Sequence, residues 1–136
     1  MFQTDNLSHS DALKVIAPIQ AKLEKEKKGA AVAVTDAHGE LIAFLRTDGC
    51  PLASINNAIN KAFTASRERK PSRAVGEASR NDNFPLTNFG DPRYIGWGGG
   101  VPISYQGTVI GAVGVSGLPE AEDMELAQLG ANVISG

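Results

Sequence analysis

Cysteine is almost absent from this sequence: Cys50 is the single one, so the chain cannot form an internal disulfide. A protein without disulfides suits a reducing compartment. The sequence also lacks an apolar run of the roughly 20 residues that a membrane span requires. Its first residues lack the basic and then apolar order of a signal peptide. These absences predict a cytoplasmic protein with no membrane partner.

An excess of basic residues is missing as well, because 13 lysines and arginines are outnumbered by 15 acids and the net charge is −2. A nucleic-acid-binding protein usually carries a basic patch, so no nucleic-acid partner is expected. Hydrophobic residues make up 42% and charged residues 21% of the 136 positions, which is typical of a globular protein. The length predicts a single domain over residues 1–136.

The spacing of apolar residues predicts helices that alternate with antiparallel hairpins, which is an α/β fold. One helical pattern follows Ser8, which suits an N-cap, and is expected to kink or break near Ala17 because Pro18 lies inside it. Gly29 is expected to end that helix. Further helices are predicted over 52–69 and 74–79 and from about 118, and strands over 30–36, 41–47, 101–105 and 108–117.

Aromatic residues are few, at 6% of the chain, yet four of them fall between residues 84 and 97. The segment around them is rich in Asn, Asp and Pro, which predicts a loop. Large rings bury much apolar area, so we expect these four to lie under the sheet or against another copy of the chain. They are Phe84, Phe89, Tyr94 and Trp97.

Three consecutive glycines, Gly98, Gly99 and Gly100, come just before a predicted strand that also holds Pro102. Glycine accepts positive φ and lets a ligand or another chain approach its backbone, but it loses entropy on folding. Two interpretations stay open: a tight corner beside a crowded strand, or a loop that faces a small ligand, which the three glycines and Pro102 would then bind. Ser116 on the following strand could present backbone N–H groups to a carboxylate or phosphate, or could cap the last helix.

A second group of polar residues could carry chemistry. Arg46 and Asp48 leave the end of a predicted strand together, and Lys61 lies in an apolar stretch of the next helix. A lysine in such surroundings can act as a base or form a Schiff base, while Arg46 could bind an anion and Asp48 could move a proton. The structural alternative is an ion pair of Arg46 with Asp48, and a Lys61 that reaches water or pairs with a carboxylate.

Several blocks occur in a fixed order along the chain: Val32–Asp36 with His38 and Gly39, Phe44–Gly49, Lys61–Ala65, Gly98–Ile103, and Gly111–Gly117 with Asp123. Together they resemble the GlcG/HbpS family, which includes the C-terminal domain of PduO. The resemblance covers nearly the whole chain and implies a profilin-like fold, with an antiparallel sheet of about five strands flanked by helices. It also implies self-association, from dimers to octamers in different members.

Some members of that family bind haem or a corrinoid, and others occur beside enzymes of small-molecule catabolism. Haem needs an axial ligand, most often an imidazole, and this chain has two histidines, His9 and His38. His9 lies in the first turn of a predicted helix and is favoured over His38, which lies in a hairpin turn. The alternative is a solvated side chain for His9 and an ordinary turn residue for His38. Cys50 and Met124 could replace them, and no residues are spaced for a closed zinc site.

The leading hypothesis is therefore a small-ligand-binding protein, with haem or a related tetrapyrrole as its ligand, that assembles from identical subunits. The alternative is a cofactor-independent enzyme that acts on a small carboxylate or aromatic metabolite. A third possibility is an accessory subunit without chemistry of its own. All three stay open at the level of sequence.

Overall fold

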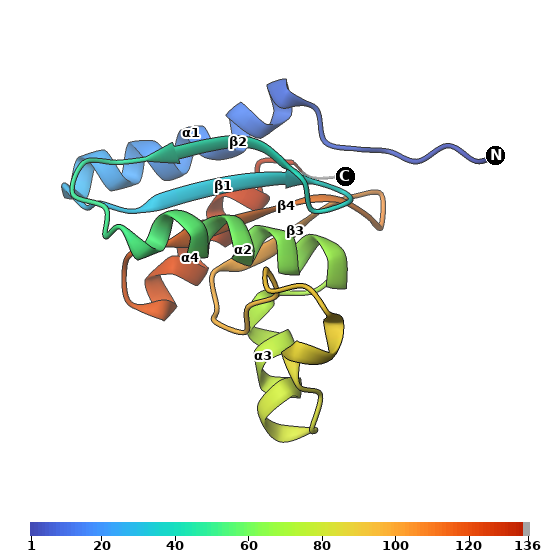
Figure 1. Cartoon of the computed structure of the whole chain (residues 1–136). Helices are drawn as coiled ribbons and strands as arrows, with labels where there is room; N and C mark the ends of the chain where they lie inside the picture. The colour runs from blue at the N-terminus through green and yellow to red at the C-terminus, as the bar shows by residue number, and fades with distance from the viewer. Residues whose placement is uncertain (135–136) are drawn as a thin grey trace.

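A four-stranded antiparallel sheet organises the chain, and the computed structural model describes residues 1–134 (Figure 1). The strands are β1 (Ala31–Asp36), β2 (Leu41–Arg46), β3 (Gly100–Tyr105) and β4 (Thr108–Ser116). They lie in the order β2-β1-β4-β3, so the two predicted hairpins meet where β1 pairs with β4. The α/β class is confirmed, with four strands in the described chain where about five were expected.

Helices cover both faces of this sheet. α1 (His9–Glu26) and α4 (Glu120–Ala131) pack together on one face, while α2 (Ala53–Glu68) crosses the other (Figure 1). α3 (Ser72–Asn81) and the short 3₁₀ helix η1 (Leu86–Phe89) project below the sheet as a lobe (Figure 1). Within residues 1–134, no helix combines the length and the apolar character that a membrane crossing would need.

The two faces of the sheet have different cores. Alanines line the α2 side, where Ala31 and Ala33 of β1 meet Ala58 and Ala62 of α2. Small side chains let a helix lie close to the strands, which fixes the position of the polar residues on α2. The α1 and α4 side holds the larger core, built from Val15, Ile19, Leu23, Val32, Val34, Val113, Val115 and their neighbours.

Local capping sets the two ends of α1. The predicted N-cap is confirmed, because the backbone N–H of Asp11 donates to Ser8 Oγ at 3.1 Å. The predicted stop at Gly29 is wrong, since Lys27 already takes the left-handed conformation, at φ 55°, and ends the helix. A non-glycine residue can occupy that region for a single position at a modest cost.

The helix continues through Pro18, so of the expected kink or break near Ala17 the break does not occur, and the kink stays a prediction. A proline inside a helix costs about 3 kcal/mol. Val15, Ile19 and Leu23 lie on either side of it and are fully buried, and each such side chain contributes about 1.5–3 kcal/mol. Burial along the whole face therefore outweighs the one lost hydrogen bond.

The aromatic segment packs less deeply than expected. Tyr94 is half-buried, with its ring stacked on Phe89 at a centroid distance of 4.0 Å and edge-on to Phe63 at 5.1 Å. Phe84, Phe89 and Trp97 remain 64%, 41% and 58% exposed. Burial of these three under the chain's own sheet was a wrong prediction, because the lobe carries the segment away from the sheet (Figure 1). Their burial against a second copy stays a prediction.

The outer strands of the sheet are β2 and β3. β3 contains Pro102, which pairs in register with Ala112 of β4. Proline has no backbone N–H, so it is confined to edge strands and to irregular positions of a sheet. Its place in the sequence is therefore consistent with the outer position of β3.

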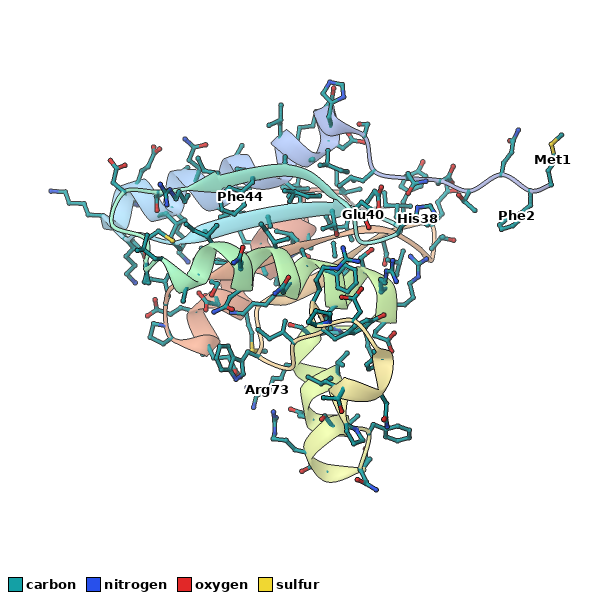
Figure 2. All side chains as sticks on the ribbon, in the orientation of Figure 1. Met1, Phe2, His38, Glu40, Phe44 and Arg73 are labelled. Carbon is teal, nitrogen blue, oxygen red and sulfur yellow. The ribbon has the colours of Figure 1, made fainter. Side chains whose placement is uncertain are left out.

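Leu7 fixes the N-terminal segment to the body. Its N–H donates to the carbonyl oxygen of Ile110 at 3.0 Å, and its side chain is buried. Before it, the chain extends away from the fold and leaves Met1 and Phe2 in solvent (Figure 2). This arm contributes nothing to the core.

Candidate functional site

A cavity of about 380 Å³ opens where β4 ends and α4 begins. Its walls come from α2 and the residues before it, from the loop around Trp97, and from the turn between β4 and α4. These segments are far apart in the sequence, and the fold brings them together. The cavity is lined by Pro51, Ser54, Asn57, Lys61, Trp97, Gly98, Ser116, Gly117, Leu118, Glu120 and Asp123.

A buried ion pair forms part of this wall. Lys61 Nζ lies 3.3 Å from Asp123 Oδ2, and it donates a second hydrogen bond to the carbonyl oxygen of Val115 at 3.0 Å. Lys61 and Asp123 are each 3% exposed, so each charge depends on the other for compensation. The structural alternative for Lys61, an ion pair with a carboxylate, is thus realised at a residue that also faces a cavity.

Asp123 lies in the first turn of α4 and is held from two sides. Besides Lys61, the backbone N–H of Leu118 binds its Oδ1 at 3.1 Å. Burial raises the pKa of Asp123 above its ordinary value of 3.8, and the Lys61 ammonium and the Leu118 hydrogen bond oppose that rise. A carboxyl group in such a balance can take up a proton more readily than an exposed aspartate.

The glycine run packs directly against Lys61. Gly99 has φ +129°, and a Cβ there would lie 2.9 Å from Lys61 Nζ. Gly100 approaches the Lys61 backbone so closely that a Cβ would overlap its carbonyl oxygen. The run is therefore a tight corner that closes over Lys61, while Gly98, at its start, also lines the cavity.

Ser72, at the start of α3, fixes the loop on which Trp97 stands. Its Oγ accepts the N–H of Gly100 at 2.9 Å and donates to the carbonyl oxygen of Trp97 at 2.7 Å. The Trp97 side chain is thereby held at the mouth of the cavity, although it is more than half exposed.

Ser116 and Pro102 have different surroundings. Ser116 ends β4, lines the cavity and is 5% exposed. Its predicted alternative role as a cap is wrong, because Pro119 occupies the N-cap of α4 and no side chain accepts a hydrogen bond there. Pro102 lies on β3 outside the lining. A ligand-binding role stays a prediction for both.

Arg46 and Asp48 are exposed, and neither lines the cavity of Lys61. Asp48 borders a separate hollow with Lys27 and Thr47. Among residues 1–134, no ion pair joins Arg46 to Asp48. The structure brings Lys61 together with Asp123 instead, and the catalytic roles of Arg46 and Asp48 remain untested predictions.

Sequence reasoning did not single out Ser54 and Asn57 of α2. Positions 54, 57 and 61 are three and four residues apart, so they share one face of the helix with Lys61. That spacing is a signal that the sequence carries. The partnership with Asp123 has no such signal, since 62 positions separate it from Lys61.

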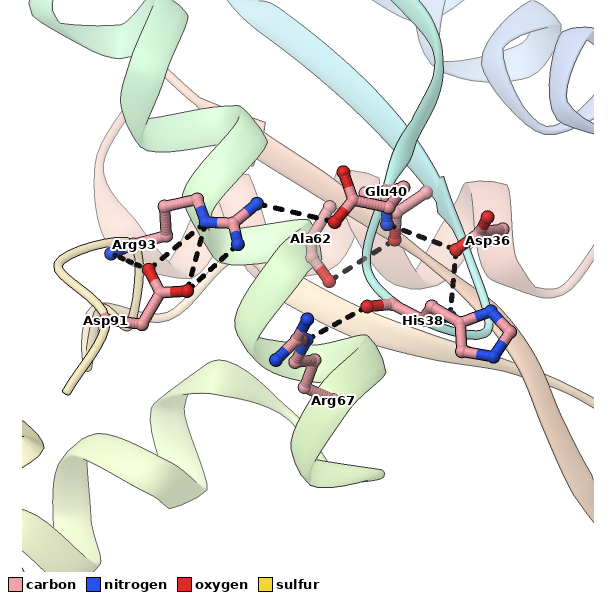
Figure 3. A network of polar contacts seen from close by, with 8 residues as sticks. Asp36, His38, Glu40, Ala62, Arg67, Asp91 and Arg93 are labelled. Carbon is pink, nitrogen blue, oxygen red and sulfur yellow. Dashed lines mark hydrogen bonds and ion pairs between the residues drawn. The ribbon is translucent and has the colours of Figure 1, made fainter. Parts of the chain in front are cut away.

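The histidines lie elsewhere on the surface. His9 is the exposed first residue of α1. The backbone of His38 is held in the β1–β2 turn, where its N–H donates to Asp36 Oδ1 at 2.8 Å and its carbonyl oxygen accepts from Arg67 Nε at 3.0 Å (Figure 3). The ring of His38 points away from Arg67 (Figure 3). Within residues 1–134, no three or more His, Cys, Asp or Glu residues cluster as a metal site.

The same network ties the β1–β2 turn to the aromatic segment. Arg93 pairs with Asp91 at 2.9 Å and with Glu40 at 3.6 Å (Figure 3). Hydrogen bonds from Arg93 lower the pKa of Asp91 below its ordinary value. The backbone of His38 thus belongs to a structural network, and a ligand role for its imidazole stays a prediction.

A second hollow, of about 370 Å³, lies beside the start of α1. Three of its lining residues flank His9 in sequence: Asp5, Asn6 and Asp11. Apolar side chains form much of the rest of its wall: Tyr105, Ile110, Val133 and Ile134.

Residues 7–132 match the family described as haem degrading protein HbpS-like. The chain belongs to this family. The HbpS-like chain is 33% identical over 110 residues to the protein GlcG of Escherichia coli, which covers 81% of each chain. It is 30% identical to a 15.0 kDa protein from the dhaT–dhaS intergenic region of Citrobacter freundii, over 93% of this chain and 90% of that one. The resemblance to the GlcG/HbpS family is confirmed.

Solved structures share the fold of this HbpS-like chain. Protein ORFY of Klebsiella pneumoniae superposes with a TM-score of 0.90 at 26% identity, covering 98% of this chain and 93% of that one. A double mutant of Streptomyces reticuli HbpS gives 0.88 at 28% identity, covering 100% and 92%. The complex of PduOC with haem gives 0.86 at 24% identity, covering 95% of each chain.

Proposed function

We propose that this HbpS-like chain binds haem, with His9 as an axial ligand. The description of the family and the haem complex of PduOC, which has the same fold, support haem as the ligand. None of the descriptions of the relatives named above mentions a corrinoid, so the proposal is confined to haem. The observation that carries it is the exposed imidazole at the start of α1, a helix whose first turn borders, through Asp11, a hollow with a partly apolar wall.

The residues around His9 fit such a ligand. Because His9 begins a helix, its side chain starts from a fixed backbone, and within residues 1–134 no hydrogen bond occupies its ring. Tyr105, Ile110 and Val133 offer apolar surface to the face or edge of a porphyrin. The larger cavity near Lys61 lacks a histidine, cysteine or methionine in its lining. When bound, haem supplies iron-centred redox chemistry, and the chain's own residues hold it and limit the access of water.

Titration with haemin, followed at the Soret band, tests this proposal. His9→Ala is expected to weaken haem binding by about tenfold or more, because loss of the ligand should cost at least as much as loss of a group that merely orients one. His38→Ala is the matched control and is expected to bind as the wild type does. An unchanged titration in His9→Ala would exclude His9 as the ligand.

A second candidate function is that of an enzyme that acts on a small metabolite at the cavity. The buried pair of Lys61 and Asp123 favours it, because an ammonium and a carboxyl with a raised pKa stand side by side at an accessible wall. Such a pair can move a proton to or from a bound molecule. Lys61→Met is expected to abolish turnover of the true substrate, whereas full activity would leave Lys61 a structural residue.

A further inference from the structure

We infer that the cavity between α2, the loop around Trp97 and the start of α4 binds a small neutral molecule that carries a hydroxyl or carbonyl oxygen beside an apolar portion. The inference deepens the second function proposed above by naming the class of its ligand, and it does not depend on haem. At about 380 Å³ the cavity lies at the lower end of the range for ligand sites, which is about 300–1,000 Å³. It therefore suits a small metabolite.

The charges of the cavity argue against an anionic ligand. Lys61 is its one cationic lining residue, and Asp123 already compensates that charge at 3.3 Å. The other acid of the lining, Glu120, pairs with Arg73 outside the cavity. The cation and both acids of the lining are thus already paired, so a carboxylate or phosphate entering here would find no free cation and its desolvation would go uncompensated.

Two buried hydroxyl groups remain available to a ligand. Ser54 and Ser116 are 6% and 5% exposed, and among residues 1–134 no hydrogen bond involves either hydroxyl. Within residues 1–134, every side-chain nitrogen or oxygen that is fully buried has a hydrogen-bond partner. Both hydroxyls must therefore reach accessible space, and the cavity that both residues line supplies it. Unpartnered polar groups in a pocket set the orientation of a ligand.

Lys61 adds a donor to this set. An ammonium group has three N–H donors. Lys61 uses two of them, one to the carbonyl oxygen of Val115 and one to Asp123. The third can donate to a carbonyl or hydroxyl oxygen of a ligand, while Asp123 keeps the site neutral. The apolar portion of the ligand would lie against Trp97, Leu118 and Pro51, which line the same cavity.

Trp97 makes the inference testable, because it is the single tryptophan of the chain and lines the cavity. Its fluorescence would be followed during titration with hydroxyacetone and acetoin as neutral probes, and with lactate as a charged probe of similar size. N-acetyltryptophanamide serves to correct for collisional quenching. We expect a saturable change with at least one neutral probe, and binding of lactate weaker by about tenfold or more.

Variants identify the site. Lys61→Met is expected to weaken the neutral probe by about tenfold, the loss of a charge-assisted hydrogen bond, whereas Lys28→Met should bind as the wild type. Lys28 is a matched control, since it pairs with Glu122 of α4 at 3.0 Å but lies outside the cavity. Ser116→Ala, a smaller change, should weaken the probe severalfold even if Lys61→Met fails to fold.

Three results would overturn the inference: tighter binding of lactate than of the neutral probes, no saturable change with either neutral probe, or wild-type affinity in both Lys61→Met and Ser116→Ala. Binding of a neutral probe without its conversion would support the ligand class while counting against the enzymatic function. His9→Ala should leave the fluorescence titration unchanged, which separates this site from the proposed haem site.

Discussion

At the residue scale, the proposed ligand site rests on the Lys61–Asp123 pair, a buried ion pair in the wall of the cavity. A buried pair of this kind is costly to break, because removal of one partner leaves an uncompensated charge in the interior. Burial and pairing also act on Asp123 in opposite directions, and burial is the larger influence on its pKa. The protonation of Asp123 should therefore be visible in the stability of the fold.

The contribution of Asp123 to the free energy of unfolding is expected to decrease as the pH rises from acidic values. The folded pKa of this group lies above its unfolded value of about 3.8, so between the two values the folded chain binds more protons. Its stabilising contribution is complete below the unfolded pKa and is lost as pH rises through the folded pKa. Urea unfolding of the wild type and Asp123→Asn across this range measures the effect as the difference in the free energy of unfolding.

Asp91→Asn provides a control of opposite sign. Arg93 lowers the pKa of Asp91, so its contribution is present above the unfolded pKa and is lost as pH falls through the folded one. Parallel profiles for the two variants would contradict the assignment of a raised pKa to Asp123.

The sequence predicts some of these residues better than others. Lys61 stands out because a charged residue interrupts an apolar helical face, and such an interruption requires a partner or a function. Trp97 and the glycine run stand out by composition. Asp123 belongs to an acidic first turn of α4 that a helix dipole alone would explain. Apart from its place in the blocks that resemble the GlcG/HbpS family, nothing distinguishes it from Glu120 and Glu122, and the fold decides which acid meets Lys61.

At the scale of elements, α3 joins the rest of the molecule through a contact between two backbones. A Cβ on Gly76 of α3 would overlap the carbonyl oxygen of Gly96, and a Cβ on Gly96 would lie 2.6 Å from Gly76 Cα. Ser72 of the same helix holds the loop that carries Trp97. The position of α3 therefore determines how the aromatic side chain stands over the cavity.

Gly76→Ala is expected to destabilise the protein by about 1–3 kcal/mol, the typical cost of overpacking. The sign of this change in the free energy of unfolding is informative, because at an ordinary helix position alanine is more favourable than glycine by about 1 kcal/mol. Urea denaturation measures the change, with Arg80→Ala on the exposed side of α3 as a control near zero. A Gly76→Ala protein more stable than the wild type would contradict the close contact.

Most element positions follow from periodicity, which is why α2 and both hairpins lie close to their predicted bounds. Two of the failures have a common cause in tertiary packing. Pro18 is tolerated because the whole face of α1 is buried, and the aromatic rings leave the sheet because α3 and η1 form a lobe. Energies summed over many side chains override a signal read at one residue.

At the scale of the whole molecule, the lobe exposes an apolar surface. A hollow of about 480 Å³ lies there, lined by Val75, Ala78, Phe84 and Phe89 and bordered by the charged residues Glu68, Lys70 and Asp82. Exposed apolar surface of this kind is typical of contacts between copies of a chain, which favour closed symmetric assembly. Self-association of this HbpS-like chain thus remains a prediction, now with a defined surface.

Light scattering is expected to give a particle mass well above the 14.3 kDa of one chain. Phe84→Glu should reduce that mass, because a charge would be buried in the contact. Phe2→Glu is the matched control: Phe2 is 87% exposed on the N-terminal arm, so the assembly should be unchanged. A monomeric wild type at working concentration would exclude the assembly.

Pro102 on β3 makes the two edges of the sheet unequal in a further way. Viewed as a template for main-chain hydrogen bonding, the β3 edge is interrupted where Pro102 has no N–H, whereas β2 offers six residues without a proline, Phe44 among them (Figure 2). An extended peptide that seeks to lengthen the sheet would therefore meet a continuous ladder at β2 and a broken one at β3. A further strand could therefore pair with the sheet along β2, whereas Pro102 disfavours such pairing along β3.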